Sequence, residues 1–141
     1  MATQFSVEWK PQAYADTTAD NSAKTFVCPA GFYYQFLGVY INYASTVTAG
    51  NRLVSVLGKS GAGDVLCSAF SSVTQAASLT YQYSFNIANP YITSLRSTTS
   101  IAPMPMIILK PGDYIEVIDD SSIDPTADDM SVYYSYLARK V

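Results

Sequence analysis

The chain has 141 residues, of which 49% are hydrophobic and 13% are charged, and its formal net charge is −3. This length suits one domain, and the apolar content is sufficient for a single core, which excludes a generally disordered chain. The eight Lys and Arg residues are scattered singly, which argues against a nucleic-acid surface that follows phosphates. No apolar run approaches the roughly 18 residues of a membrane helix, and the first 24 residues lack the pattern of a signal peptide.

Tyrosine stands out among the residue types, with 12 copies. A weakly charged surface rich in tyrosine is typical of protein contacts, because tyrosine offers a large contact area and keeps a polar tip. Tyrosine is also favoured in β-strands for its packing alone. Composition by itself leaves both interpretations open.

Residues 1–24 are predicted to form an N-terminal arm ahead of the main domain, residues 25–141. Phe5, Val7 and Trp9 alternate with polar residues, which predicts a short strand with one apolar face that ends at Pro11. This segment is either the first strand and loop of the same domain or an arm whose apolar face packs on a neighbouring subunit. On the second interpretation the candidate protein-interface residues are Phe5, Val7, Trp9 and Tyr14.

The rest of the chain alternates short apolar runs with polar turns at spacings of roughly ten residues, as antiparallel sandwiches do. Strands are expected at residues 25–28, 32–48, 52–57, 64–70, 78–87, 106–109, 114–119 and 130–138. Gly38 is expected to bend or bulge the longest of them. Pro103 and Pro105 make the segment around them an edge or crossover, because proline donates no hydrogen bond to a ladder.

These elements predict an all-β fold, a single antiparallel β-sandwich of about eight strands with a jelly-roll-like organisation. No segment shows the period and the caps of a long helix. The clearest half-buried strand is 78–87, in which Leu79, Tyr81, Tyr83 and Phe85 are expected to share one mostly buried face.

Most catalytic chemistry is excluded by residue type. Gly58-Lys59-Ser60 resembles the end of a phosphate-binding loop, but Leu53 occupies the position of the first glycine and residues 54–57 are a predicted strand. An ordinary hairpin is therefore expected. Catalysis by a Ser–His or Cys–His pair is impossible because the chain has no histidine. Cys28 and Cys67 lack the spacing of a metal site and are predicted to be unpaired thiols, so no enzyme activity, cofactor or metal is expected.

The remaining candidate is an acidic segment that follows the strand 114–119. Hard oxygen ligands in a loop can hold Ca²⁺, but the spacing here does not match the alternating EF-hand pattern and the loop has no glycine. Because residues 121–129 are too polar to bury, a solvated turn in which aspartates cap backbone N–H groups is expected instead. The residues are Asp119, Asp120, Asp124, Asp128 and Asp129.

Two stretches carry a family resemblance. Residues 45–85 contain a strand, the turn Gly50-Asn51-Arg52, a second strand, a glycine hairpin and Thr74-Gln75-Ala76-Ala77-Ser78 before an aromatic strand. Leu109-Lys110-Pro111-Gly112-Asp113-Tyr114 and residues 123–130 then precede the last two strands. Together they resemble small structural proteins of tailed bacteriophages, encoded among virion head and connector genes. The resemblance covers residues 32–141, rests on turns and strand edges, and carries over no catalytic residue.

The resemblance implies a structural virion protein that binds and stabilises the phage capsid as a decoration or cement protein, in virions assembled in the host cytoplasm. Its implied partners are the major capsid protein or other virion proteins, and further copies of the chain, in a trimer on the capsid. A head–tail connector or tail component is the alternative within the virion. A carbohydrate-binding module, with Trp9 and tyrosines as a sugar platform, ranks third. Neither nucleic acid nor a membrane is an expected partner.

Overall fold

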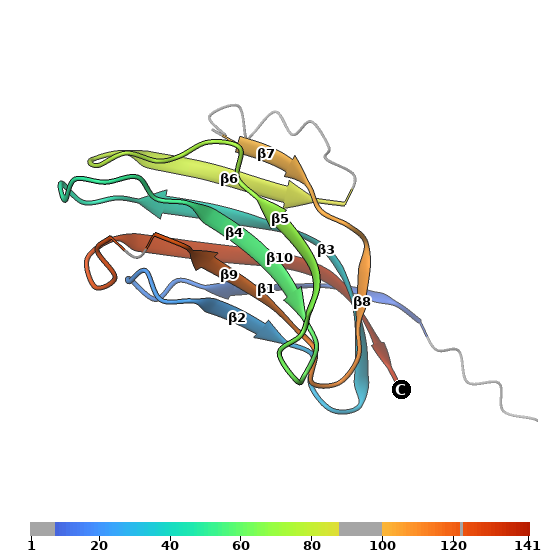
Figure 1. Ribbon diagram of the computed structural model, residues 1–141. Coiled ribbons are helices and arrows are strands. Elements are labelled where there is room, and N and C mark those ends of the chain that lie inside the picture. The colour runs from blue at the N-terminus through green and yellow to red at the C-terminus, as the bar shows by residue number, and fades with distance from the viewer. Residues whose placement is uncertain (1–7, 88–99, 122) are drawn as a thin grey trace, which may run out of the picture.

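The computed structural model describes residues 8–87, 100–121 and 123–141. Within these ranges the chain forms strands, and no helix long and apolar enough to cross a membrane is present in them. The strands make a six-stranded sheet, called sheet A, and a four-stranded sheet, called sheet B, which pack face to face (Figure 1). The strands are β1 Lys10–Asp16, β2 Lys24–Val27, β3 Phe32–Ala44, β4 Val54–Lys59, β5 Val65–Phe70, β6 Thr80–Asn86, β7 Ser100–Pro103, β8 Ile107–Leu109, β9 Tyr114–Asp119 and β10 Asp129–Lys140.

The order of the strands is that of a jelly roll. Sheet A runs β1-β10-β3-β6-β7, with β8 also paired to β3, and sheet B runs β2-β9-β4-β5. The antiparallel pairings are nested, β4 with β5, β3 with β6, β2 with β9 and β1 with β10, as in one long hairpin folded over itself. The parallel pair β6–β7 is an addition at one edge. The predicted jelly-roll-like sandwich is confirmed.

Strand β3 is the centre of sheet A, with β10 along one side and β6 and β8 along the other. Its register against β10 slips beside Gly38 and leaves Leu37 as the extra residue of a bulge. A side chain at Gly38 would place its Cβ 1.9 Å from Oδ1 of Asn86, so this close approach requires glycine. The bulge predicted at this position is confirmed.

The core lies between the two sheets and is built from alternate residues of the strands. β10 buries every second side chain from Met130 to Ala138, and β9 buries Ile115, Val117 and Asp119. The largest apolar side chains in the centre include Phe36, Ile41, Tyr43, Tyr83, Phe85, Leu109 and Tyr134. Burial of such a side chain stabilises the fold by about 1.5–3 kcal/mol, so this interior is the main source of stability.

The face predicted for residues 78–87 is correct only in part. Tyr83 and Phe85 are fully buried and Tyr81 is half-buried. Leu79 is 38% exposed, and the prediction that it is buried is wrong. β6 begins one residue later, and the carbonyl of Leu79 instead accepts a hydrogen bond from Ser45 N at 2.8 Å, beyond the end of the strand.

The prediction that Pro11 ends the first strand is also wrong. β1 runs through Pro11 and pairs with β10 along its whole length. It forms the edge of sheet A, where a missing N–H is tolerated because only one side of the strand needs partners. Pro103 lies in β7 at the opposite edge, as its sequence context predicts. That residues 1–24 act as an arm stays a prediction, and Phe5 and Val7 lie outside the described residues.

Candidate functional site

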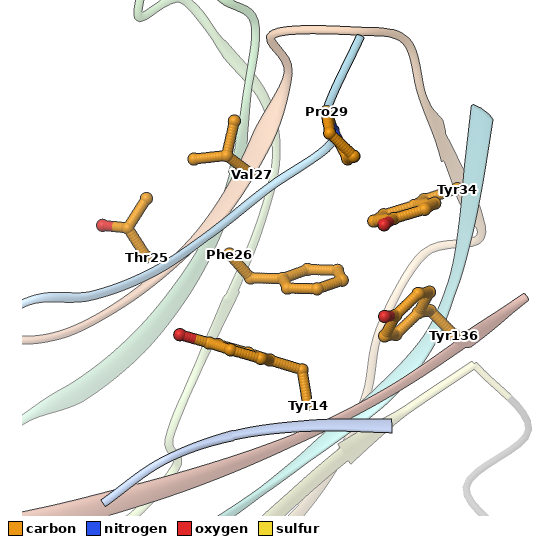
Figure 2. Close-up of a pocket in the computed structure, with 7 residues that line it drawn as sticks. All are labelled: Tyr14, Thr25, Phe26, Val27, Pro29, Tyr34 and Tyr136. Atoms are coloured by element: carbon orange, nitrogen blue, oxygen red, sulfur yellow. The ribbon is translucent and has the colours of Figure 1, made fainter. Parts of the chain in front are cut away.

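A groove lies between the edges of the two sheets, at β1 and β2. It contains a cavity of about 370 Å³. Figure 2 shows aromatic rings from β1, β2, β3 and β10 converging on this space. The lining residues are Tyr14, Thr25, Phe26, Val27, Pro29, Tyr34 and Tyr136. We call this feature the aromatic groove.

Strand geometry turns these rings toward one another. Tyr14 stands opposite Tyr134 in the register of β1 and β10, and Phe26 is an inward position of β2. Between ring centroids, Phe26 lies 5.7 Å from Tyr14 and 4.6 Å from Tyr136. It lies 5.4 Å from Tyr34 with the ring planes only 15° apart. Contacts of this kind contribute about 0.5–1.5 kcal/mol beyond burial, so Phe26 holds the floor of the groove in place.

The aromatic groove is uncharged. Its lining residues carry hydroxyl groups from tyrosine and threonine, and none of those described is acidic or basic. Burial, together with the neighbouring Tyr136, raises the pKa of Tyr34 to about 12, so this phenol stays neutral near pH 7. Such a lining suits an apolar or aromatic side chain of another protein better than an ion.

The structure separates the predicted interface residues. Tyr14 lines the aromatic groove and is 46% exposed. Trp9 is half-buried, and the guanidinium carbon of Arg139 lies 5.9 Å from the centre of its ring. Sequence reasoning did not connect Tyr14 with the other lining rings. Alternation shows that those rings point inward, but it does not show that the sandwich leaves an opening at this end.

The outward side of sheet A is a second uncharged surface. Tyr40 and Tyr133 stand opposite each other in the register of β3 and β10, with ring centroids 5.9 Å apart, and Tyr133 is 42% exposed. Among the described outward positions, charge occurs at the ends, at Asp129 and Arg139. The positions between them are uncharged and include Ala13, Ala15, Asn42, Gln82, Ser131, Ser135 and Leu137. We call this surface the tyrosine face.

The acidic segment is not simply a solvated turn. Asp128 is buried, so the prediction that residues 121–129 are too polar to bury is wrong at this position, and Asp119, the last residue of β9, is buried as well. They do cap backbone N–H groups as predicted: Leu53 N donates to Asp119 Oδ1 at 3.0 Å, and Thr46 N donates to Asp128 Oδ1 at 2.7 Å. The Tyr43 hydroxyl also donates to Asp119 Oδ2 at 2.5 Å. These bonds compensate for the loss of water.

Arg52 explains why a carboxylate can be buried here. Its Nε and Nη2 donate to the two oxygens of Asp128 at 2.8 and 3.0 Å, and both side chains are 0% exposed. Its Nη1 donates to the carbonyls of Thr48 and Gly50 at 2.9 and 2.8 Å. Burial acts to raise the pKa of Asp128, but the hydrogen bonds from Arg52 and Thr46 outweigh it and hold the pKa below its usual value. This satisfied pair fixes the acidic segment to the start of β4.

The other candidates for chemistry occupy structural positions. Gly58 and Lys59 lie in β4, whose pairing with β5 confirms the predicted hairpin. The Nζ atom of Lys59 lies 2.9 Å from Oε1 of Glu116 and forms an ion pair with it. Cys28 is buried and Cys67 is half-buried, and both are free thiols. Across the part of the chain that the structure describes, no group of three or more Cys, Asp or Glu side chains is placed to hold a metal ion.

Comparison with known proteins gives no family. No family model matches the sequence, and no curated protein matches it. Solved structures resemble the chain only at low identity, and they include pilus and viral capsid proteins. A protein of the Bacillus endospore appendages, which form disulfide-linked pili, is 9% identical, with 99% of this chain and 92% of that chain covered and a TM-score of 0.36.

Two further structures show the same level of similarity. VP2 of infectious bursal disease virus, in a subviral particle, is 11% identical with a TM-score of 0.36, and the match covers 94% of this chain and 33% of that chain. A CocE/NonD family hydrolase from Staphylococcus aureus is 10% identical with a TM-score of 0.33, and the match covers 96% of this chain and 37% of that chain. This chain therefore spans about a third of VP2. Similarity at this level assigns no function.

Proposed function

We propose that this chain is a structural virion protein that binds the capsid of a tailed bacteriophage as a decoration or cement protein and stabilises the shell. Its partners are the major capsid protein or other virion proteins, and further copies of itself. It resides in the virion after assembly in the host cytoplasm. The proposal joins the family resemblance of residues 32–141 to the uncharged surfaces, because a jelly roll alone hosts many functions.

The observation that carries the proposal is the tyrosine face. Tyr40 and Tyr133 lie near its centre, and the surrounding side chains are small or uncharged. The centres of protein interfaces are depleted of charged residues and enriched in tyrosine. A broad sheet surface with this composition suits a protein that works by lying against a neighbour in a shell.

The predicted arm residues supply a second contact in this proposal. Trp9 directly precedes β1, the strand that borders the aromatic groove. An apolar segment carrying Phe5, Val7 and Trp9 and an uncharged groove lined by Tyr14 are chemically complementary, so the segment of one copy fits the groove of a neighbour. Burial of each apolar side chain would contribute on the order of 2 kcal/mol.

The tyrosine face is tested by placing a charge at its centre. Tyr133→Arg is expected to lower the affinity for purified capsids at least about tenfold, because a buried unpaired charge opposes association. Tyr114→Arg, at an outward position of β9 in sheet B, is the matched control and should bind as the unmodified chain does. Equal binding by both variants, with unchanged circular dichroism, would overturn the proposed face.

The arm is tested separately in the full-length chain. Combined substitution of Phe5, Val7 and Trp9 by serine is expected to weaken capsid binding or self-association at least about tenfold. Ser6→Ala with Glu8→Ala, on the alternate positions of the same segment, is the control. If the triple variant binds normally, the segment is only a tied-down terminus.

A further inference from the structure

Strand β5 is an edge of sheet B that lacks protecting charges and prolines, and the one irregularity in its pairing with β4 is a bulge at Leu66. It pairs with β4 on one side, and no described strand pairs with its other side. Its sequence, VLCSAF, contains no charge, proline or glycine. Val65, Leu66 and Phe70 are 58%, 50% and 60% exposed. Edge strands normally carry charges, prolines or bulges that prevent pairing with another chain.

The other sheet edges in the described residues are protected or short. β1 contains Pro11 and carries charged residues at both ends, and β7 ends with Pro103. β2 has four residues and β8 has three. We infer that the free edge of β5 pairs antiparallel with the β5 of a second copy across a two-fold axis, which joins two four-stranded sheets into one.

The ladder between β4 and β5 shows which backbone groups are available. Ser71 N donates to Val54 O at 3.0 Å, one step beyond the paired residues of the two strands. Residues of an antiparallel strand alternate between facing one neighbour and facing the other. From Cys67 to Ser71 this alternation is unbroken, so the N–H and C=O groups of Ser68 and Phe70 point to the open edge, where a second strand can meet them. Leu66 is the extra residue of a bulge and lies outside the regular ladder.

The side chains select the register of this pair. With Ser68 on the two-fold axis, the bulge residue Leu66 of one copy comes next to Phe70 of the other, so two exposed apolar side chains cover each other. With Cys67 on the axis, Asp64 would lie opposite Phe70 instead. The first register keeps apolar groups together and places no like charges opposite each other, so it is the one we adopt.

This contact concerns self-association and does not rest on the proposed virion role. It is also two-fold, and so differs from the trimer that the family resemblance implies. The two ideas are separable, because binding to capsids tests the tyrosine face whereas the β5 contact is tested on the isolated protein. A contact through the arm can form in addition, since β1 and β5 are edges of different sheets.

A charge exchange at Ser68 tests the register directly. Ser68 is exposed, so Ser68→Lys and Ser68→Glu should fold normally, and circular dichroism checks this. Each variant alone places like charges opposite each other on the axis and should raise the dimer dissociation constant about fivefold in sedimentation velocity. An equimolar mixture should form the mixed dimer at least as tightly as the unmodified chain. Thr126→Lys and Thr126→Glu, at an exposed position of the turn between β9 and β10, should change nothing.

A second variant examines the hydrogen bonds. Ser68→Pro removes an N–H that points away from β4, so it leaves the β4–β5 ladder intact and should weaken the dimer more than about tenfold. The proposal is overturned if the unmodified chain stays monomeric at the highest concentration, or if it forms a trimer that ignores charge at Ser68. It is also overturned if mixing the Ser68→Lys and Ser68→Glu variants does not restore the dimer.

Discussion

Replacing Arg52 with methionine should cause one of the largest losses of stability available in this chain. The substitution removes both charged hydrogen bonds to Asp128, at 2.8 and 3.0 Å, and leaves that fully buried carboxylate with Thr46 and Tyr43 as partners. It also leaves the carbonyls of two loop residues without their donor. Removing one partner of a buried ion pair costs about 3–5 kcal/mol, a large share of the roughly 5–15 kcal/mol that stabilises a typical domain.

The assay is equilibrium urea unfolding at pH 7, followed by circular dichroism. Arg52→Met should lower the free energy of unfolding by about 3–5 kcal/mol and the melting temperature by roughly 10 °C. Lys140→Met, at an exposed position, is the control and should stay within about 0.5 kcal/mol. The double variant Arg52→Met with Asp128→Leu should recover most of the loss, because no unpaired charge is left. A loss below about 1 kcal/mol for Arg52→Met would refute the role assigned to this pair.

Three further predictions concern acid, packing and metal. The pKa values of Asp119 and Asp128 are lowered in the folded chain, so the stability that the two carboxylates supply is complete above their usual pKa of 3.8 and is lost as pH falls through the folded pKa values. Urea unfolding between pH 7 and pH 2 should show this loss, and Asp128→Asn should flatten the dependence of the free energy of unfolding on pH. Gly38→Ala should cost about 1–3 kcal/mol in the same assay, because its Cβ would lie 1.9 Å from Asn86 Oδ1 and 3.0 Å from the Phe85 carbonyl oxygen, and equal stability would disprove the close contact. Adding EDTA should leave the melting temperature unchanged, whereas a large drop that Ca²⁺ reverses would show that the acidic segment binds metal.

Strand positions and inward faces could be predicted because they depend on local alternation. β9 and β10 show this most clearly, since apolar and aromatic residues at every second position mark the buried side. The bulge at Gly38 could also be predicted, because a glycine inside a long apolar strand often marks a bulge or a close approach of another chain segment. Local sequence did not predict features that depend on whether a strand lies at the edge or in the middle of its sheet. Pro11 is acceptable only because β1 is an edge, and the sequence around it does not show which strand will be an edge.

Long-range partners could not be predicted from the sequence. The burial of Asp128 depends on Arg52, which lies 76 positions earlier, and an isolated acidic segment gives no sign of a cation that distant. The aromatic groove has the same origin, because its rings come from four strands that meet only when the nested pairings form. The free edge of β5 likewise follows from the order of sheet B and not from its apolar sequence alone.

The most direct test of the proposed role is the number of copies of this chain in purified virions, measured by quantitative mass spectrometry against the major capsid protein. A decoration protein should be present in a fixed ratio to the capsid protein, with a copy number that grows with the size of the shell. A single ring of copies per particle would instead identify a head–tail connector or tail component. Absence of the chain from purified particles would contradict a structural role in the virion altogether.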